Sequence, residues 1–520
     1  MTGTALGTPA YRRRRPAGLL GASVAVAAAV LTPLVFLVIE AVGAGTGNIV
    51  SVIDRPLTAQ LLWNTARLTV TVGALCTFIG VGAAWLVERT DLPGRRVWTV
   101  LLVVPLAIPD FVVSFGWQSR SNAVSGFQGA VLVMTLAVYP LVYLPVAASL
   151  RNADPALEEV ARSLGVGRLA TWWRVTVAQA RVAILGGCLL VALVILAEYG
   201  AFEILGYQTF TTEIFTEFDV EFKIAVACGL SLVLVALGMI VLAGEAAARG
   251  GRRVSRADRM AQRPVRRHPL GHWKVPAVSA LLVLVLLALG VPVASAADWW
   301  VTGPQGLIEG FSMAADAWHT ALYGACAAAA DTLAAVPVAV LALRHGTRVR
   351  RLLERSTYLV LAVPGLVVAL SLAYFSENYA GGLWYQTAPM LVAAYAIMFF
   401  PLALVGVRAS VVQAPPRLEE VARSLGQRRW SVLWRVTRPL VAPGLAAAFC
   451  LVFLEAVTEL TATLILVPTG VQTLATQFWQ YQRSLAYGQA APFALLIIAI
   501  AAVPSYVLGR YFDRLPAAAT

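Results

Sequence analysis

Long apolar stretches follow one another along almost the whole chain, and they restrict its fold more than any other feature. Hydrophobic residues make up 59% of the 520 residues, and charged residues make up only 13%. A soluble domain carries roughly 25% charged residues. A membrane-spanning helix needs roughly 20 apolar residues, and by that criterion about twelve stretches qualify. We therefore expect an all-α, polytopic membrane protein whose surrounding medium is the lipid bilayer.

The expected spans fall into two sets of six. They are 17–43, 61–87, 98–118, 127–150, 181–200 and 223–247, followed by 275–296, 319–343, 356–375, 386–411, 441–457 and 490–510. The first span follows a run of arginines, as a signal peptide would. It is long, however, and it ends at Glu40 instead of a small-residue cleavage site. We expect it to be retained as a span.

Arginine-rich loops alternate with loops that are poor in arginine and often acidic. The net charge is +13, and the positive-inside rule places the arginine-rich loops in the cytoplasm. Twelve spans then predict that both termini lie on the cytoplasmic side of the plasma membrane. This explanation of the charge requires no nucleic acid partner. The basic segment 249–273 is expected to be a cytoplasmic linker that also meets anionic lipid headgroups.

Short sequences recur in the two sets of spans. The nonamer LEEVARSLG occurs at 157–165 and 418–426, and WRVT follows each copy at the same spacing. EYGAFEIL (198–205) similarly pairs with ELTATLIL (459–466). We infer two repeats, 1–248 and 274–520, on either side of the linker. Because each has an even number of expected spans, they share one orientation and form a parallel repeat.

The nonamers lie in loops 151–180 and 412–440, which resemble the EAA loop of ABC importer permeases. The family pattern is Glu-Ala-Ala, three residues, Gly, nine residues and Ile-x-Leu-Pro. This chain has valine at the middle alanine of both copies, no closing proline in the first copy, and Arg438 at the leucine position of the second. The resemblance implies a type I ABC importer permease fold. It also implies that each loop forms a short coupling helix seated in an ATPase subunit.

The residues of these loops suit such contacts. Ala161 and Leu164 offer a small apolar face for a groove. Glu158, Glu159 and Arg162 flank it with charge that can set the register, and Gly165 can end the helix in a left-handed conformation. The predicted coupling residues are Glu158, Glu159, Ala161, Gly165, Glu419, Glu420, Ala422 and Gly426.

The chain lacks a GxxxxGK[ST] phosphate-binding loop, so we expect no ATPase activity from it. ATP and Mg²⁺ would be used by a partner ATPase, expected in two copies, and an extracytoplasmic solute-binding protein would meet the acidic loops. The cysteines and histidines form no recognised metal motif. We therefore expect neither a bound cofactor nor a stable metal site.

Ionisable residues inside spans are costly and often line a transport path. The candidates are Asp110, Glu198, Asp331, Glu455 and Glu459. Glu198 and Glu459 occupy equivalent positions in the two repeats, and Glu455 lies on the same helix face as Glu459. Since carboxylate and phenol oxygens suit hard cations, the predicted path residues are Glu198, Tyr199, Glu455 and Glu459.

Among ABC permeases, fused two-half versions resemble those for ferric iron and for thiamine. The segments 206–215 and 459–479 resemble the ferric-iron group, although Thr458 and Thr461 replace the lysine and proline usual there. Ferric iron is therefore the first expectation, and thiamine, a polyamine or another small cation are alternatives. A gradient-driven secondary transporter would leave the duplicated nonamer unexplained. A membrane enzyme would need a nucleophile and base, and we find no such set.

Overall fold

The computed structural model describes residues 17–43, 51–221, 223–249, 267–304, 310–344 and 359–514. Apart from turns and one isolated bridge between Thr90 and His268, this part of the chain is helical. The predicted all-α class is therefore confirmed. The expected arginine run before the first span and most of the expected linker lie outside the described residues.

Ten helical segments of the described chain are long and apolar enough to cross a membrane, and a bent pair adds an eleventh if it counts as one span. In the first half they are α1 (Ala17–Gly43), α3 (Pro56–Arg89), α6 with α7 (Gly126–Val138, Pro140–Arg151), α10 (Ala178–Ala197, continuous with the π-helix η2) and α13 (Ile224–Arg249). In the second half they are α14 with α15 (Lys274–Val285, Val291–Thr302), α16 (Gly310–Arg344), α19 (Ala388–Val412), α22 (Arg438–Thr458, continuous with the π-helix η7) and α25 (Tyr487–Arg514).

Two of the twelve expected spans are not confirmed. The segment expected at 98–118 is the bent pair: α4 (Arg95–Leu101) with a 3₁₀ turn, then α5 (Asp110–Gln118), with a bend of 90°. The segment expected at 356–375 overlaps α18 (Gly365–Tyr379), which has only 15 residues, and its first three positions lie outside the described residues.

A proline causes the break in each half. Pro109 and Pro364 directly precede α5 and α18, and both have an extended backbone, with ψ of 142° and 149°. Proline offers no N–H for a continuing helix, and it disfavours helical backbone in the residue before it. The same break at matched positions is structural evidence for the repeat.

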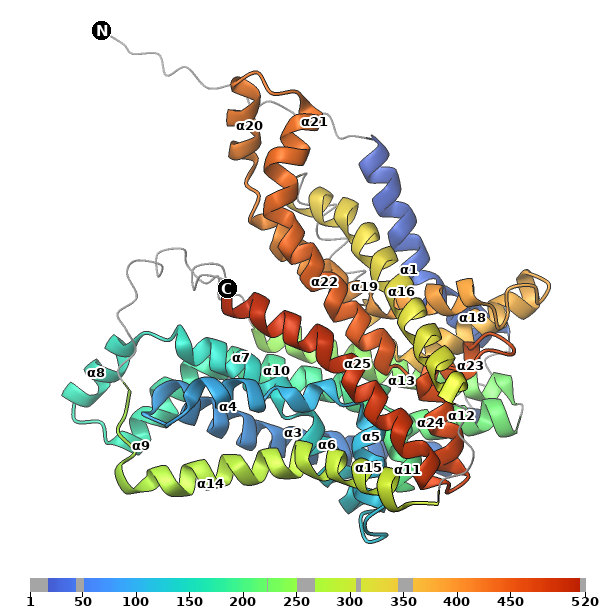
Figure 1. Cartoon of the computed structure of the whole chain (residues 1–520), viewed down its shortest axis with the longest axis horizontal. Helices are drawn as coiled ribbons and strands as arrows, with labels where there is room; N and C mark the ends of the chain where they lie inside the picture. Colours follow the sequence, from blue (N-terminus) through green and yellow to red (C-terminus); the bar gives the residue numbers. More distant parts are fainter. Residues whose placement is uncertain are drawn as a thin grey trace.

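The two halves meet at one end of the molecule and diverge toward the other (Figure 1). At the shared end lie α5, α11 (Gly200–Leu205), α23 (Thr461–Leu466) and α24 (Leu474–Arg483). The far tips of the two halves carry α8 (Pro155–Ser163) and α20 (Pro416–Ser424).

Each half places its first span against the other half. α1 packs on α16 and α18, and α15 packs on α5. At the second contact, a Cβ on Gly116 would lie 2.5 Å from Pro292 Cα, so only glycine allows this approach. The ring of Phe478 on α24 lies 5.3 Å from that of Phe111 and 5.4 Å from that of Phe115. The shared end is therefore a packed interface between the halves.

Candidate functional site

The two nonamers form helices of identical design, α8 and α20. Each begins with proline in its first turn, and Gly165 and Gly426 both have φ of +81°. The amide after each glycine returns to the alanine carbonyl: Val166 N to Ala161 O at 3.0 Å, and its counterpart to Ala422 O at 3.2 Å. This is the hydrogen bond of a glycine-terminated helix. The left-handed ending expected at both glycines is confirmed.

The first glutamate of each nonamer faces the protein. Thr176 Oγ1 donates to Glu158 Oε1 at 2.8 Å, and Thr437 Oγ1 donates to Glu419 Oε1 at 3.2 Å. Both threonines close WRVT, and in each half WRVT lies in a single π-helical turn, η2 (Trp172–Val177) or η7 (Leu433–Thr437). We name each pair a Thr–Glu latch. The Thr–Glu latch explains why WRVT recurs at a fixed distance from the nonamer. That fixed spacing in both halves is the sequence signal from which the latch could have been predicted.

The latch of the first half has further charged partners. Arg89, only 1% exposed at the end of α3, forms an ion pair with Glu158, and His268 Nε2 lies 3.8 Å from Glu158 Oε2. Burial raises the pKa of Glu158. The nearby His268 ring, the hydrogen bond from Thr176 and the charge of Arg89 act against burial and leave this pKa below its usual range. In the second half, Arg423 pairs with Glu419 from within α20, at 3.3 Å.

The end of the expected linker is fixed to the first half. His268 N donates to Arg89 O at 2.8 Å, and Asp91 N donates to His268 O at 3.2 Å. Lys274 Nζ lies 2.7 Å from Asp91 Oδ2. A hydrogen bond from Lys274 and one from the Leu270 amide lower the pKa of Asp91. The chain therefore enters the second half from a point anchored beside α8.

The opposite face of α8 and of α20 is apolar and exposed. On α8 this ridge consists of Leu157, Val160 and Leu164, and on α20 it consists of Leu418, Val421 and Leu425. The last leucine of each ridge is 76% exposed. An exposed apolar patch rimmed by polar residues is typical of a protein interaction site.

The remaining predicted coupling residues divide between the two faces of these helices. Glu159 and Glu420 are exposed, Ala161 is half-buried and Ala422 is buried. The predicted alanines thus face inward. Leucine and valine form the exposed ridge, and their spacing within LEEVARSLG was the sequence signal for it.

Two glutamates occupy matched helix breaks at the shared end. Glu198 follows α10 and Glu459 follows α22, and both have extended backbone, with ψ of 133° and 123°. Glu198 Oε1 accepts from Ala201 N at 2.7 Å, and Glu459 Oε1 accepts from Ala462 N at 2.9 Å. Each carboxylate thereby caps the short helix that follows it, where the helix dipole favours negative charge.

Two more carboxylates complete what we call the carboxylate group: Asp110, Glu198, Glu455 and Glu459. Asp110 interacts electrostatically with Glu198 and with Glu455, and Glu459 interacts with the same two residues. Glu455 is exposed and the other three are half-buried. In the described part of the chain, none of the four forms a salt bridge. The group is therefore rich in negative charge and has no basic partner there.

The other candidate residues lie elsewhere. Tyr199 stacks on Phe215 at 4.4 Å and lies 5.6 Å from the Trp479 ring, so it packs in the interface between the halves. Asp331 is buried in α16 without electrostatic contact to the carboxylate group. Within the described ranges, no three His, Cys, Asp or Glu side chains are arranged to hold a metal ion.

Comparison with known proteins agrees with this architecture. The family model described as "Binding-protein-dependent transport system inner membrane component" matches twice, at residues 76–249 and 332–516. The chain is 36% identical to the Fe(3+)-transport system permease protein FbpB 2 of Haemophilus influenzae, over 92% of this chain and 95% of that protein.

Other relatives are more distant. The ferric transport system permease protein FbpB of Actinobacillus pleuropneumoniae is 21% identical, over 87% of this chain and 71% of that protein. The molybdenum transport system permease protein ModB of Escherichia coli is 28% identical, over 27% of this chain and 69% of that protein. With both halves matched, the chain belongs to the inner membrane components of binding-protein-dependent transport systems and carries two copies of the family's domain in one polypeptide.

Proposed function

We propose that this permease moves ferric iron into the cytoplasm. As an inner membrane component of a binding-protein-dependent ABC importer, it is not itself the ATPase. Ferric iron is inferred as the cargo chiefly from the carboxylate group. The ferric-transport relatives support the same cargo.

Charge distinguishes the possible cargoes. Four carboxylates that interact with one another and have no Lys or Arg partner among the described residues repel one another unless protons or a cation neutralise them. They would also repel an oxyanion such as sulfate. A highly charged hard cation gains most from this arrangement, because it prefers oxygen ligands.

The carboxylate group is suited to the passage of a cation and not to its storage. The carboxylates come from both halves, at the end where the halves meet, and no described trio forms a preformed metal cage. Conduction requires binding that is weak enough for release. Relative movement of the halves would change the spacing of the carboxylates and so their affinity for a cation.

The partners and the orientation belong to the same proposal. The ridges on α8 and α20 are suited to two ATPase copies, one below each half. The tips that bear them would lie in the cytoplasm, as the basic loops predict, and both termini would lie there too. The solute-binding protein would deliver iron at the opposite end, where acidic residues such as Asp219 and Glu221 are exposed.

Uptake in cells tests the proposal. Cells that carry or lack this gene are supplied with labelled ferric iron, thiamine or sulfate under iron limitation. We expect only iron uptake to depend on the gene, and a gene-dependent uptake of thiamine or sulfate alone would refute the cargo. The variant Leu164→Asp/Leu425→Asp should abolish uptake while the protein stays in the membrane, and normal uptake by it would refute the coupling role of the ridges.

A further inference from the structure

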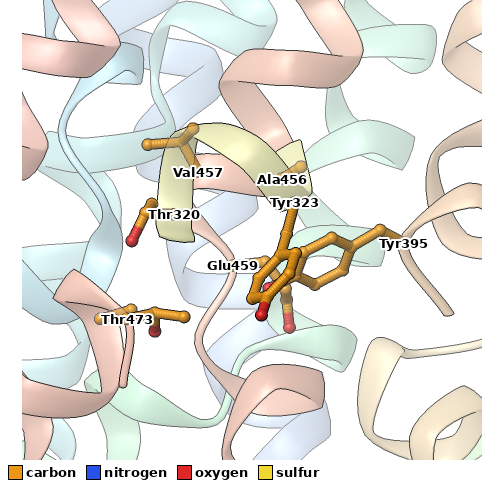
Figure 2. A pocket seen from close by; sticks show the side chains of 8 residues that line it. Thr320, Tyr323, Tyr395, Ala456, Val457, Glu459 and Thr473 are labelled. Carbon is orange, nitrogen blue, oxygen red and sulfur yellow. The ribbon is translucent and has the colours of Figure 1, made fainter. Parts of the chain in front are cut away.

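A narrow pocket beside Glu459 brings together oxygen atoms from several helices. It lies where α16, α19 and α22 meet the start of α24, and its lining includes Thr320, Tyr323, Tyr395, Glu459 and Thr473. Figure 2 shows the two phenol rings turned toward the Glu459 side chain. Tyr395 interacts electrostatically with both Glu459 and Tyr323. The space is too narrow for a water molecule, so the pocket is closed in this conformation.

Hydrogen bonds define the state of Tyr395. Thr463 Oγ1 donates its one hydrogen to Glu459 O at 2.7 Å. The hydroxyl of Tyr395 lies 2.5 Å from the same Oγ1 and must therefore be the donor in that contact. Tyr395 is thus a protonated phenol here, tied to the helix break that Glu459 occupies.

The first half has the matching glutamate but not the phenols. The repeat places Leu68 at the position of Tyr323, Met134 at that of Tyr395 and Phe202 at that of Thr463. All three are fully buried apolar side chains. The break at Glu198 has a threonine hydroxyl of its own, because Thr211 Oγ1 donates to Glu198 O, but packing there requires no phenol at the positions of Leu68 and Met134. The two phenols in the pocket beside Glu459 therefore call for a chemical explanation.

We propose that Tyr323, Tyr395 and Glu459 form a transient binding site for ferric iron in the second half, an inference that rests on the function proposed above. Phenolate and carboxylate oxygens are hard ligands, and tyrosinate is an established ligand of ferric iron. When a phenol oxygen bonds to the metal, its O–H bond breaks and the proton leaves to water, with no change in oxidation state. Iron binding therefore releases protons and becomes tighter as pH rises.

The pocket must open to admit iron. Its walls come from separate spans of the second half and from α24, which also packs on the first half through Phe478. Movement of the halves relative to one another would shift α24 and open or close this space. In the closed conformation the pocket has no room for iron, and the carboxylate group is the route by which iron reaches it once it opens.

Absorption spectroscopy tests the site directly. The purified full chain, in nanodiscs with its partner ATPase, is titrated with ferric nitrilotriacetate, and the visible phenolate-to-iron charge-transfer band is recorded. We expect the wild type to show this band and the band to strengthen as pH rises. We expect Tyr323→Phe/Tyr395→Phe to lose it. Tyr139→Phe should keep it, because Tyr139 is a buried tyrosine of the first half whose counterpart in the second half is Phe400.

Each result has a defined meaning. A wild type without the band at saturating iron, or a double variant that keeps it, overturns the phenolate site. If the wild type still takes up iron in such a case, the carboxylates carry it alone and the proposed function stands. If the gene supports no iron uptake at all, the proposed function fails as well. Equal thermal stability of the three proteins shows that loss of the band is not loss of the fold.

Discussion

At the scale of single residues, the latch residues explain why loop sequences recur more faithfully than the spans. Glu158 and Thr176 contact each other across 18 positions of sequence, as do Glu419 and Thr437. Side chains that face lipid can exchange one apolar residue for another without losing a specific contact. A carboxylate held by a hydroxyl at a fixed spacing cannot be exchanged without losing the hydrogen bond.

Removing the hydroxyl of Thr176 should loosen α8. A hydrogen bond to a charged group contributes about 1.5–3 kcal/mol, so Thr176→Val should speed exchange of the α8 amides with solvent by about tenfold or more. Native-state hydrogen exchange measures this change. Ser163→Ala is the control, because the exposed Ser163 hydroxyl bonds within α8, to Val160 O. Equal exchange rates in the two variants would disprove the latch.

The anchoring of α8 should also depend on pH. The folded protein holds the pKa of Glu158 below its usual range, which is about 4.3 in an unfolded chain. A lowered carboxylate pKa contributes stability above the unfolded value and loses it as pH falls through the folded value. Protection of the α8 amides should therefore be retained at neutral pH and fall only in acid below about pH 4.3. Glu158→Gln should remove this acid transition, and a transition that persists in this variant would assign it to another group.

At the scale of elements, the sequence predicted some helices well and others poorly. The nonamers, with their glycines at 165 and 426, predicted the short helices α8 and α20 and their left-handed ends. Hydropathy did not show the breaks at Pro109 and Pro364, because the segments before and after each proline remain largely apolar, with Asp110 the one charged residue beside them. It also did not show which face of α8 lies inward, since that depends on Thr176 and Arg89, which are distant in sequence.

The first span of the second half packs against the first half through the close contact of α15 with α5. Gly116→Ala would push a methyl group into Pro292 Cα. Overpacking of this kind costs about 1–3 kcal/mol, so the melting temperature of the purified protein should fall. Gly82→Ala is the matched control, because a Cβ on this α3 glycine meets nothing within 4 Å. A Gly116→Ala protein as stable as the control would show that the two helices can separate at no cost.

At the scale of the whole molecule, the two halves share features of the backbone but not all of their chemistry. Both halves have the same proline break, a glutamate at the second break and a short helix formed by the nonamer. The pocket beside Glu459 contains Tyr323 and Tyr395, whereas the matching positions of the first half are Leu68 and Met134. Fusion in one polypeptide lets each half acquire residues that the other lacks. The repeat could be predicted from the sequence, but which side chains converge at the interface between the halves could not.

The carboxylate group is the centre of this account, and ATP-driven uptake into proteoliposomes tests it most directly. The permease, its ATPase and its solute-binding protein are reconstituted, and entry of labelled ferric iron is compared among the wild type, Glu198→Gln/Glu459→Gln and the exposed control Glu377→Gln. We predict that the wild type and the control carry iron, whereas the double variant hydrolyses ATP but carries almost none. Wild-type iron uptake by Glu198→Gln/Glu459→Gln would contradict the account.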